Sequence, residues 1–210
     1  DAQLFKFSSR NPEAVKQHTI IDNFADYSKH YFLGGDPEFG NFQGVLNNIN
    51  DLQVHAGKRP GTPDVNVWGI SDKALFLEAN EVFRKQAKPF FAYIQTSGNH
   101  RPFDKTMAST DTDFIRVSVE TETLKKYGFE SVDEFNAFRY FDYCVQQFLA
   151  AAQKESYFSN TIFVFVGDHG VAGNAEAIYP PVWTEQRLTD EHVPLLFYAP
   201  QLLTAQRRKE

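Results

Sequence analysis

The segment TIFVFVGDHG, residues 161–170, ends an apolar run on an acid and an imidazole that stand between two glycines. Asp168 offers a carboxylate oxygen and His169 an imidazole nitrogen, and Zn²⁺ and Mn²⁺ accept such mixed ligands. Successive side chains on a regular strand point to opposite faces, so both could reach one ion only where the backbone turns. Gly167 and Gly170 permit that turn. The pattern fits a metal site, and it also fits an N-cap aspartate with an incidental histidine in a strand-to-helix turn.

Other polar side chains stand where apolar runs begin or end. Asp36 follows YFLGG, His100 follows FFAYIQT in the segment SGNHRPF, and His192 precedes VPLLFYAP. In open α/β sheets, ligands bind outside the carboxyl ends of the strands, so these groups could converge with Asp168 and His169. Each also has a plainer interpretation: Asp36 as a turn acid, His100 as a loop histidine bonded to backbone groups, and His192 as a strand-edge histidine.

The elements that must position these groups alternate between short apolar runs and helical segments. That alternation indicates an α/β domain with a mostly parallel central sheet flanked by helices. A short strand is expected in 30–36, breaking at Gly34-Gly35, and another in 90–96. Buried strands are expected in 159–167 and 193–200.

Two segments have the pattern of helices. Residues 71–86 form the first, with Ser71 or Asp72 as its cap, and residues 131–155 form the second, where Ser131 and Glu134 make a capping box. The second helix carries one apolar stripe, made of Val132, Phe135, Phe138, Phe141, Val145, Phe148 and Leu149. The polar stretch 97–130 between the helices is long enough to be a functional loop or to hold small insertions.

Composition excludes several classes of protein. The net charge of −6 lacks the basic footprint of a nucleic-acid-binding protein. The single cysteine, Cys144, excludes an internal disulfide and a Cys-rich zinc site. The 210 residues suit one domain or a large part of one, and the absence of an initiator Met and of a signal-like start predicts a processed or excised piece. Trp68 is expected to serve packing, and Ser8-Ser9-Arg10 is a chance combination.

Several segments resemble one known group of enzymes. NTIFVFVGDHG resembles the metal-binding strand of the alkaline phosphatase and sulfatase superfamily, and EHVPLLFYAP resembles the strand that follows it there. FLGGDPEFGNFQG, VWGISDKALF, KPFFAYIQTSGNHRPF and the helix FRYFDYCVQQFLAAAQKESYFSNTI resemble the lipoteichoic acid synthase branch. The matches keep the order of that branch and cover roughly residues 20–205. The resemblance implies an alkaline phosphatase-like, three-layer αβα fold.

The resemblance also implies an activity. It points to a metal-dependent phosphoester transferase or hydrolase that acts on a phospholipid- or glycan-linked substrate through a Thr or Ser nucleophile. The cofactor would be a divalent metal, Mn or Zn, with Ca or Mg possible. Asp168 and His169 would be two of its ligands, and His100 would contact the transferred phosphoryl group or its alcohol. The domain would be extracytoplasmic, periplasmic or on the outer face of the cell membrane, with a membrane anchor in the full-length protein outside this chain.

The expected substrate-binding side chains depart in part from the branch. Asp36 would hydrogen-bond the head group, His192 would be a further ligand or support, and Asn41 and Gln43 stand where the synthases have a Trp and an Arg. An arginine binds phosphate through two parallel hydrogen bonds, so its absence speaks against a glycerol-phosphate substrate.

The family's nucleophile and first acidic ligand precede the segment resembled by residues 20–36, and neither is identifiable in this chain. Residues 1–210 are therefore expected to be one α/β domain, the C-terminal part of a larger sulfatase-type catalytic domain. Two alternatives remain open. The first is a sulfatase, although Cys144 lacks the Cys-x-Pro-x-Arg context of a formylglycine precursor. The second is a non-catalytic binding domain that keeps the fold.

Overall fold

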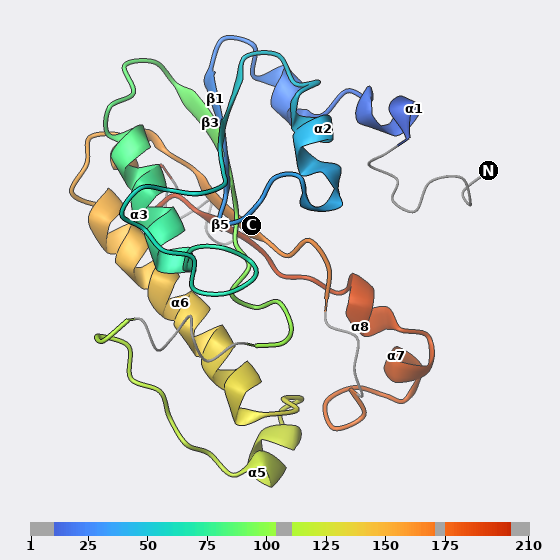
Figure 1. Ribbon diagram of the computed structural model, residues 1–210. Coiled ribbons are helices and arrows are strands. Elements are labelled where there is room, and N and C mark those ends of the chain that lie inside the picture. Colours follow the sequence, from blue (N-terminus) through green and yellow to red (C-terminus); the bar gives the residue numbers. More distant parts are fainter. Residues whose placement is uncertain (1–10, 104–110, 171–174, 203–210) are drawn as a thin grey trace.

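Three parallel strands form the main sheet of the computed structural model, which describes residues 11–103, 111–170 and 175–202. The strands β1 (Ser28–Leu33), β2 (Leu52–His55) and β3 (Phe90–Gln95) lie in the order β2-β1-β3 (Figure 1). Leu33 pairs with Gln95, so β1 and β3 end at the same edge. The segments that carry Asp36 and His100 leave the sheet there.

Helices cover the sheet on both faces, as expected for the α/β class. The long helices α3 (Asp72–Phe83) and α6 (Val132–Ala152) lie side by side on one side of the sheet, and α2 (Phe42–Leu46) lies on the other (Figure 1). The remaining described helices are α1 (Pro12–Val15), α5 (Thr121–Lys125), α7 (Val182–Glu185), α8 (Leu188–Glu191) and the 3₁₀ turns Ile20–Asn23, Phe39–Asn41 and Phe158–Asn160. Within the described ranges, none of the helices has the length and apolar character needed to cross a bilayer.

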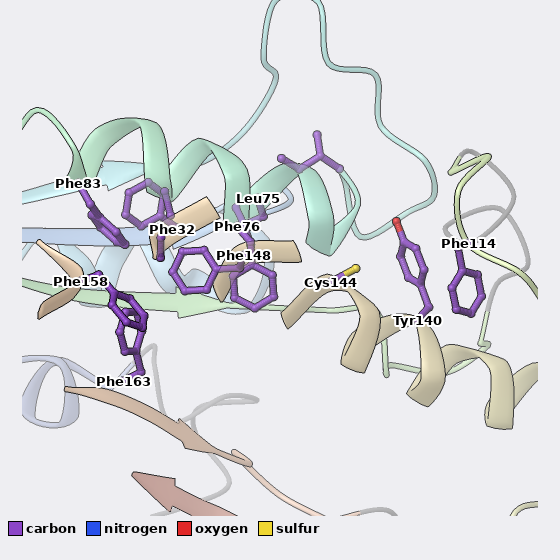
Figure 2. Packing of buried hydrophobic residues seen from close by; sticks show 13 residues of the cluster. Phe32, Leu75, Phe76, Phe83, Phe114, Tyr140, Cys144, Phe148, Phe158 and Phe163 are labelled. Atoms are coloured by element: carbon purple, nitrogen blue, oxygen red, sulfur yellow. The ribbon is translucent and has the colours of Figure 1, made fainter. Parts of the chain in front are cut away.

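The alternation of side chains along β1 divides the core into two clusters. Phe32 points to the larger cluster beneath α3 and α6, whereas Tyr31 and Leu33 point to the smaller one beneath α2. In the larger cluster the rings of Phe76 and Phe148 stack at 5.1 Å between the two helices (Figure 2). The sheet is therefore held from both sides.

The buried face of α6 is rotated from the predicted stripe. Its fully buried apolar residues recur every fourth position, as Tyr140, Cys144, Phe148 and Ala152. Phe138 is 37% exposed, so its place in the predicted stripe is wrong. The rotation has a polar cause: Asn136, fully buried, accepts a hydrogen bond from the Val117 amide and donates one to the Val117 carbonyl. The segment before α5 thus docks on α6 at Asn136, which lies outside the predicted apolar stripe.

Both long helices begin at the predicted serines. Ser71 accepts a hydrogen bond from the Ala74 amide, and Ser131 accepts one from the Glu134 amide. The Glu134 carboxylate binds the amide of Glu130, one residue before the cap. These bonds satisfy amides that have no partner inside a helix.

Strands β4 (Phe163–Val166) and β5 (Leu195–Tyr198) form a separate antiparallel pair within the described residues. The prediction that both are buried is wrong. Directly opposite residues share a face, and one face of this pair is apolar and open to solvent. Its members, which we call the bare β4–β5 face, are Ile162, Val164, Val166, Leu195 and Phe197, each at least 50% exposed. The inner face packs on the core through Phe163 and Phe165.

One arginine binds the ends of two strands. Arg59 donates to the carbonyls of Leu33 and His55 at 3.0 Å and to that of Gly57 at 2.8 Å, and its Nε donates to Glu78 on α3. Its side chain is only 12% exposed. Strand-end carbonyls have no ladder partner, so the guanidinium replaces the water that the fold excludes.

Two histidines meet inside the main sheet. His30 on β1 is 1% exposed, and its Nδ1 lies 3.1 Å from Nε2 of His55 on β2. This contact requires one ring to donate and the other to accept, which two neutral imidazoles can do. Burial lowers the pKa of His30, and burial followed by repulsion from His30 lowers the pKa of His55 below the usual 6.5.

We therefore expect acid to destabilise the fold through this pair. Below about pH 6.5 these two histidines bind protons in the unfolded chain but bind fewer in the folded chain, because their pKa values are lowered there. The free energy of unfolding therefore falls as the pH falls through that range. Asp72 acts in the opposite direction, because burial raises its pKa to about 6. Urea denaturation at pH 7, 6 and 5 should show a flatter decline for His55→Gln than for the natural sequence. Parallel pH curves for the two proteins would contradict this role of the pair.

Candidate active site

Asp168 and His169 lie at the end of β4 with exposed side chains, at 71% and 68%. Nδ1 of His169 lies 2.8 Å from the Gly170 carbonyl, so it carries the proton and donates to that oxygen. Nε2 of His169 is then the ring nitrogen with a free lone pair, and it lies 3.6 Å from Oδ2 of Asp168. The other carboxylate oxygen accepts the His169 amide at 2.9 Å. One oxygen and one nitrogen thus face the same space.

The glycines around this dipeptide allow another segment to approach. The Gly170 amide donates to the Asp190 carbonyl at 2.7 Å, and the Gly167 amide donates to the Pro194 carbonyl at 3.2 Å. A Cβ on Gly170 would lie 1.8 Å from the Thr189 carbonyl oxygen, so only glycine fits there. His192 stands between these two contact points and therefore lies across from Asp168 and His169. Its ring packs against Trp183 at 5.2 Å.

His100 belongs to a second group at the carboxyl ends of β1 and β3. The centre of its ring lies 4.1 Å from that of Trp68, and the rings of Trp68 and Phe39 meet edge to face at 5.4 Å. Nδ1 of His100 lies 2.6 Å from the Arg101 carbonyl, so the proton is on Nδ1 and Nε2 is free to bind a ligand. Trp68 thus serves packing, as expected, and the group it packs is the candidate catalytic imidazole.

Asp36, Asn41 and Gln43 follow β1 in a tight turn beside this second group. Asp36 accepts the Glu38 amide at 2.9 Å and keeps its other carboxylate oxygen exposed. Asn41 adopts a left-handed conformation at φ 63°, and the side-chain amide of Gln43 donates to the side chain of Asn47, the residue that caps the end of α2. Gln43 is therefore held by its own helix, whereas Asp36 remains open to a ligand.

Two tyrosines stack within the main sheet. Tyr31 and Tyr93 stack at 5.1 Å in the middle of β1 and β3. Burial raises the pKa of Tyr93, and the negative charge of Asp168 raises it further. No hydrogen bond, ion pair or ring contact among the described residues joins His100 to Asp168 or His169, so the structure brings the predicted residues together as two neighbouring sets.

The donor set fits a divalent metal in part. A carboxylate oxygen and an imidazole Nε2, with the proton held on Nδ1 by a carbonyl, are the ligand types and the orientation that Zn²⁺ and Mn²⁺ sites use. Across residues 11–103, 111–170 and 175–202 no group of three or more His, Cys, Asp or Glu side chains is arranged to hold a metal. Asp168 and His169 could therefore supply two ligands of a metal ion, and its remaining ligands would have to come from outside the described residues.

A family comparison matches the chain from residue 12 to residue 210 and describes the family as Sulfatase. The chain belongs to the sulfatase family. Within it, the chain resembles the lipoteichoic acid synthase branch. It is 23% identical to "Lipoteichoic acid synthase 1" of Bacillus subtilis over 86% of this chain and 28% of that protein. It is 27% identical to "Lipoteichoic acid synthase 2" of the same organism over 63% of this chain and 20% of that protein.

Solved structures of this superfamily share the fold. The lipoteichoic acid synthase LtaP of Listeria monocytogenes superposes with a TM-score of 0.63 at 19% identity, covering 84% of this chain and 44% of that one. An alkaline phosphatase superfamily protein of Vibrio parahaemolyticus gives 0.61 at 25% identity, covering 91% and 45%. The α/β fold predicted for this sulfatase-family chain is thus confirmed. The chain spans less than half the length of each of these proteins.

Two features of the site were missed from the sequence. Asp72 was expected only as a possible helix cap, yet its carboxylate binds the loop that carries His100. Tyr31 and Tyr93 were expected only as strand residues, and the structure stacks their rings across β1 and β3. The one available signal in the sequence was the position of Asp72 directly after the cap Ser71. An acid at the start of a helix is usually solvated, so this position did not indicate a buried contact with a loop.

Proposed function

We propose that this sulfatase-family chain is part of a metal-dependent phosphoester transferase or hydrolase whose substrate is linked to a lipid or a glycan. The observation that carries the proposal is the pair Asp168 and His169, which presents a carboxylate oxygen and, in the neutral ring, the Nε2 lone pair at the end of β4. A Streptococcus pyogenes phosphoglycerol transferase, GacH, solved with sn-glycerol-1-phosphate, shares the fold with a TM-score of 0.53 at 18% identity over 87% of this chain and 46% of that one. It supports a phosphoester substrate for the present chain.

In this proposal each group has a separate task. Asp168 and His169 would hold a divalent cation, Mn or Zn, with His192 on the facing segment as a supporting group. The cation would supply positive charge beside the phosphoryl oxygens. His100 turns its free Nε2 to the phosphoryl group or its alcohol, and Asp36 accepts a hydrogen bond from the head group.

The chemistry is substitution at phosphorus. A Thr or Ser hydroxyl, supplied by protein outside residues 1–210, forms a bond to phosphorus as the bond to the departing alcohol breaks. His100, at Nε2, moves a proton to or from an alcohol oxygen. A second acceptor then takes the phosphoryl group from the nucleophile. The reaction is a transfer where this acceptor is an alcohol and a hydrolysis where it is water.

The same proposal covers domain and location. Residues 1–210 form the C-terminal part of a larger catalytic domain, and the bare β4–β5 face offers an apolar surface against which the remainder of such a domain can pack. The domain would work outside the cytoplasm in a membrane-anchored protein. Its relatives named lipoteichoic acid synthases support this placement.

A chelation experiment tests the proposal. The full-length protein, treated with EDTA and then given Mn²⁺ or Zn²⁺, should regain cleavage of an aryl phosphodiester and bind metal in stoichiometric amount. An aryl sulfate should remain intact, because the proposed nucleophile is a Thr or Ser hydroxyl and not a formylglycine; within this chain Cys144, fully buried in α6, is no candidate for a formylglycine precursor. Cleavage of the aryl sulfate would establish a sulfatase instead, and absence of both metal and turnover would establish a binding domain.

A further inference from the structure

One short segment connects the ends of β1 and β3. The Ile70 amide donates to the Gly34 carbonyl at 3.1 Å, just after β1. The Trp68 carbonyl lies so close to Gly35 that a Cβ there would stand 2.5 Å from its oxygen. Two residues further along, Asp72 reaches the loop after β3. The segment 68–72 therefore holds both loops that carry the candidate head-group and phosphoryl contacts.

The carboxylate of Asp72 binds two backbone amides of the His100 loop. Oδ1 accepts the Ser97 amide at 3.0 Å, and Oδ2 accepts the Gly98 amide at 3.0 Å. Asp72 is 1% exposed, and no described Lys, Arg or His forms an ion pair with it. A buried carboxylate without a cationic partner is costly to a fold, so stability alone does not explain this residue.

The two anchored residues lead directly to the candidate imidazole. The Ser97 carbonyl accepts the His100 amide at 3.0 Å, which closes a turn from Ser97 to His100. The ring of His100 then rests on Trp68 at 4.1 Å. Asp72 thus fixes the backbone of the turn, and Trp68 fixes the ring at its end. Both come from the same segment, so they cannot shift independently of each other.

We propose that Asp72 is a positioning residue for His100, which it holds through the amides of Ser97 and Gly98. This inference rests on the proposed function for its catalytic consequence, although the placement of the ring can be measured without turnover. Asn at position 72 removes the buried charge but can accept only with its carbonyl oxygen, and its NH₂ group would face an amide N–H. The loop should therefore loosen without loss of the fold.

Fluorescence measures the placement directly. Residues 1–210 contain two tryptophans, so in a preparation of these residues, shown by circular dichroism to be folded, Trp183→Phe leaves Trp68 as the sole indole. A protonated imidazole that contacts an indole quenches its fluorescence, so the emission of Trp68 should decrease as His100 is protonated. His100→Ala should abolish the pH-dependent step, and Asp72→Asn should reduce or abolish it. Asn80→Ala serves as the matched control, because Asn80 is also buried on α3 but binds Tyr157 instead of the loop.

Kinetics and stability supply the second measurement, in the full-length protein. Asp72→Asn should lower kcat about 10²-fold with little change in KM, the effect of a reacting group displaced by about 1 Å. Its free energy of unfolding should stay equal or rise. An unchanged quenching step in Asp72→Asn would overturn the proposal. If the natural protein shows no turnover at all, the proposed function fails, and the fluorescence result alone decides whether Asp72 positions His100.

Discussion

Replacing Asp168 with alanine in the full-length protein should lower phosphodiester turnover about 10³-fold and abolish stoichiometric binding of Mn²⁺ or Zn²⁺. A bound metal contributes several kcal/mol of charge stabilisation in a transition state, and each 1.36 kcal/mol is a factor of ten. Asp168 is exposed and keeps one carboxylate oxygen free of any amide, so its loss should leave the fold intact. Metal analysis and steady-state kinetics on the same preparation measure both effects.

A matched control separates this effect from a general loss of negative charge. Asp142 is exposed on α6 and belongs to neither group of the candidate site. Asp142→Ala should keep full metal content and turnover. Retention of bound metal in Asp168→Ala would remove this residue from the metal site, and with it the main support for a metal-dependent reaction in this part of the chain.

Replacing Arg59 with alanine should destabilise the fold by about 3 kcal/mol, the largest effect on stability that we expect from one substitution. The change removes the donors that Arg59 gives to the carbonyls of Leu33, His55 and Gly57, and it leaves Glu78 without this cation. Glu78 is 30% exposed and can be hydrated, which limits the loss. For a chain of 210 residues this corresponds to a fall in Tm of roughly 6–12 °C.

Two further variants test the reason for that loss. Arg59→Lys keeps the positive charge but cannot reach several carbonyls at once, so it should lose most of the same stability. Arg84→Ala removes an exposed ion pair with Glu81 and should change stability by less than about 0.5 kcal/mol. Equal stability of the natural protein and Arg59→Lys would show that charge alone matters and that the bonds to the strand ends do not.

The regular elements of the fold were largely predictable. Strand β3 and helices α3 and α6 lie inside the predicted segments, and β1 overlaps its predicted segment but begins two residues earlier, at Ser28. The sequence carries serine caps and apolar periodicity at the right spacing for these elements. Strand β2 was missed, since its four residues, Leu52–His55, carry no strong apolar pattern. The rotation of α6 could not be predicted either, because it depends on a buried hydrogen bond between Asn136 and a backbone segment that is distant in the sequence.

The candidate site was predictable in its members and less so in its arrangement. The sequence places Asp36, His100 and Asp168 after apolar runs, and parallel strands bring the first two to one edge of the sheet. The contact between His100 and Trp68 joins two loops that no periodicity relates. The roles of these residues stay predictions, and the variants above are designed to decide them.

The bare β4–β5 face has a consequence for recombinant work on residues 1–210 alone. Exposed strands with apolar side chains on an open face invite pairing between copies, which leads to aggregation. Such a preparation should need low concentration or mild detergent to stay monodisperse. A charged substitution such as Val164→Lys, central in that face, should improve its solubility while preventing assembly with any polypeptide that normally covers the surface.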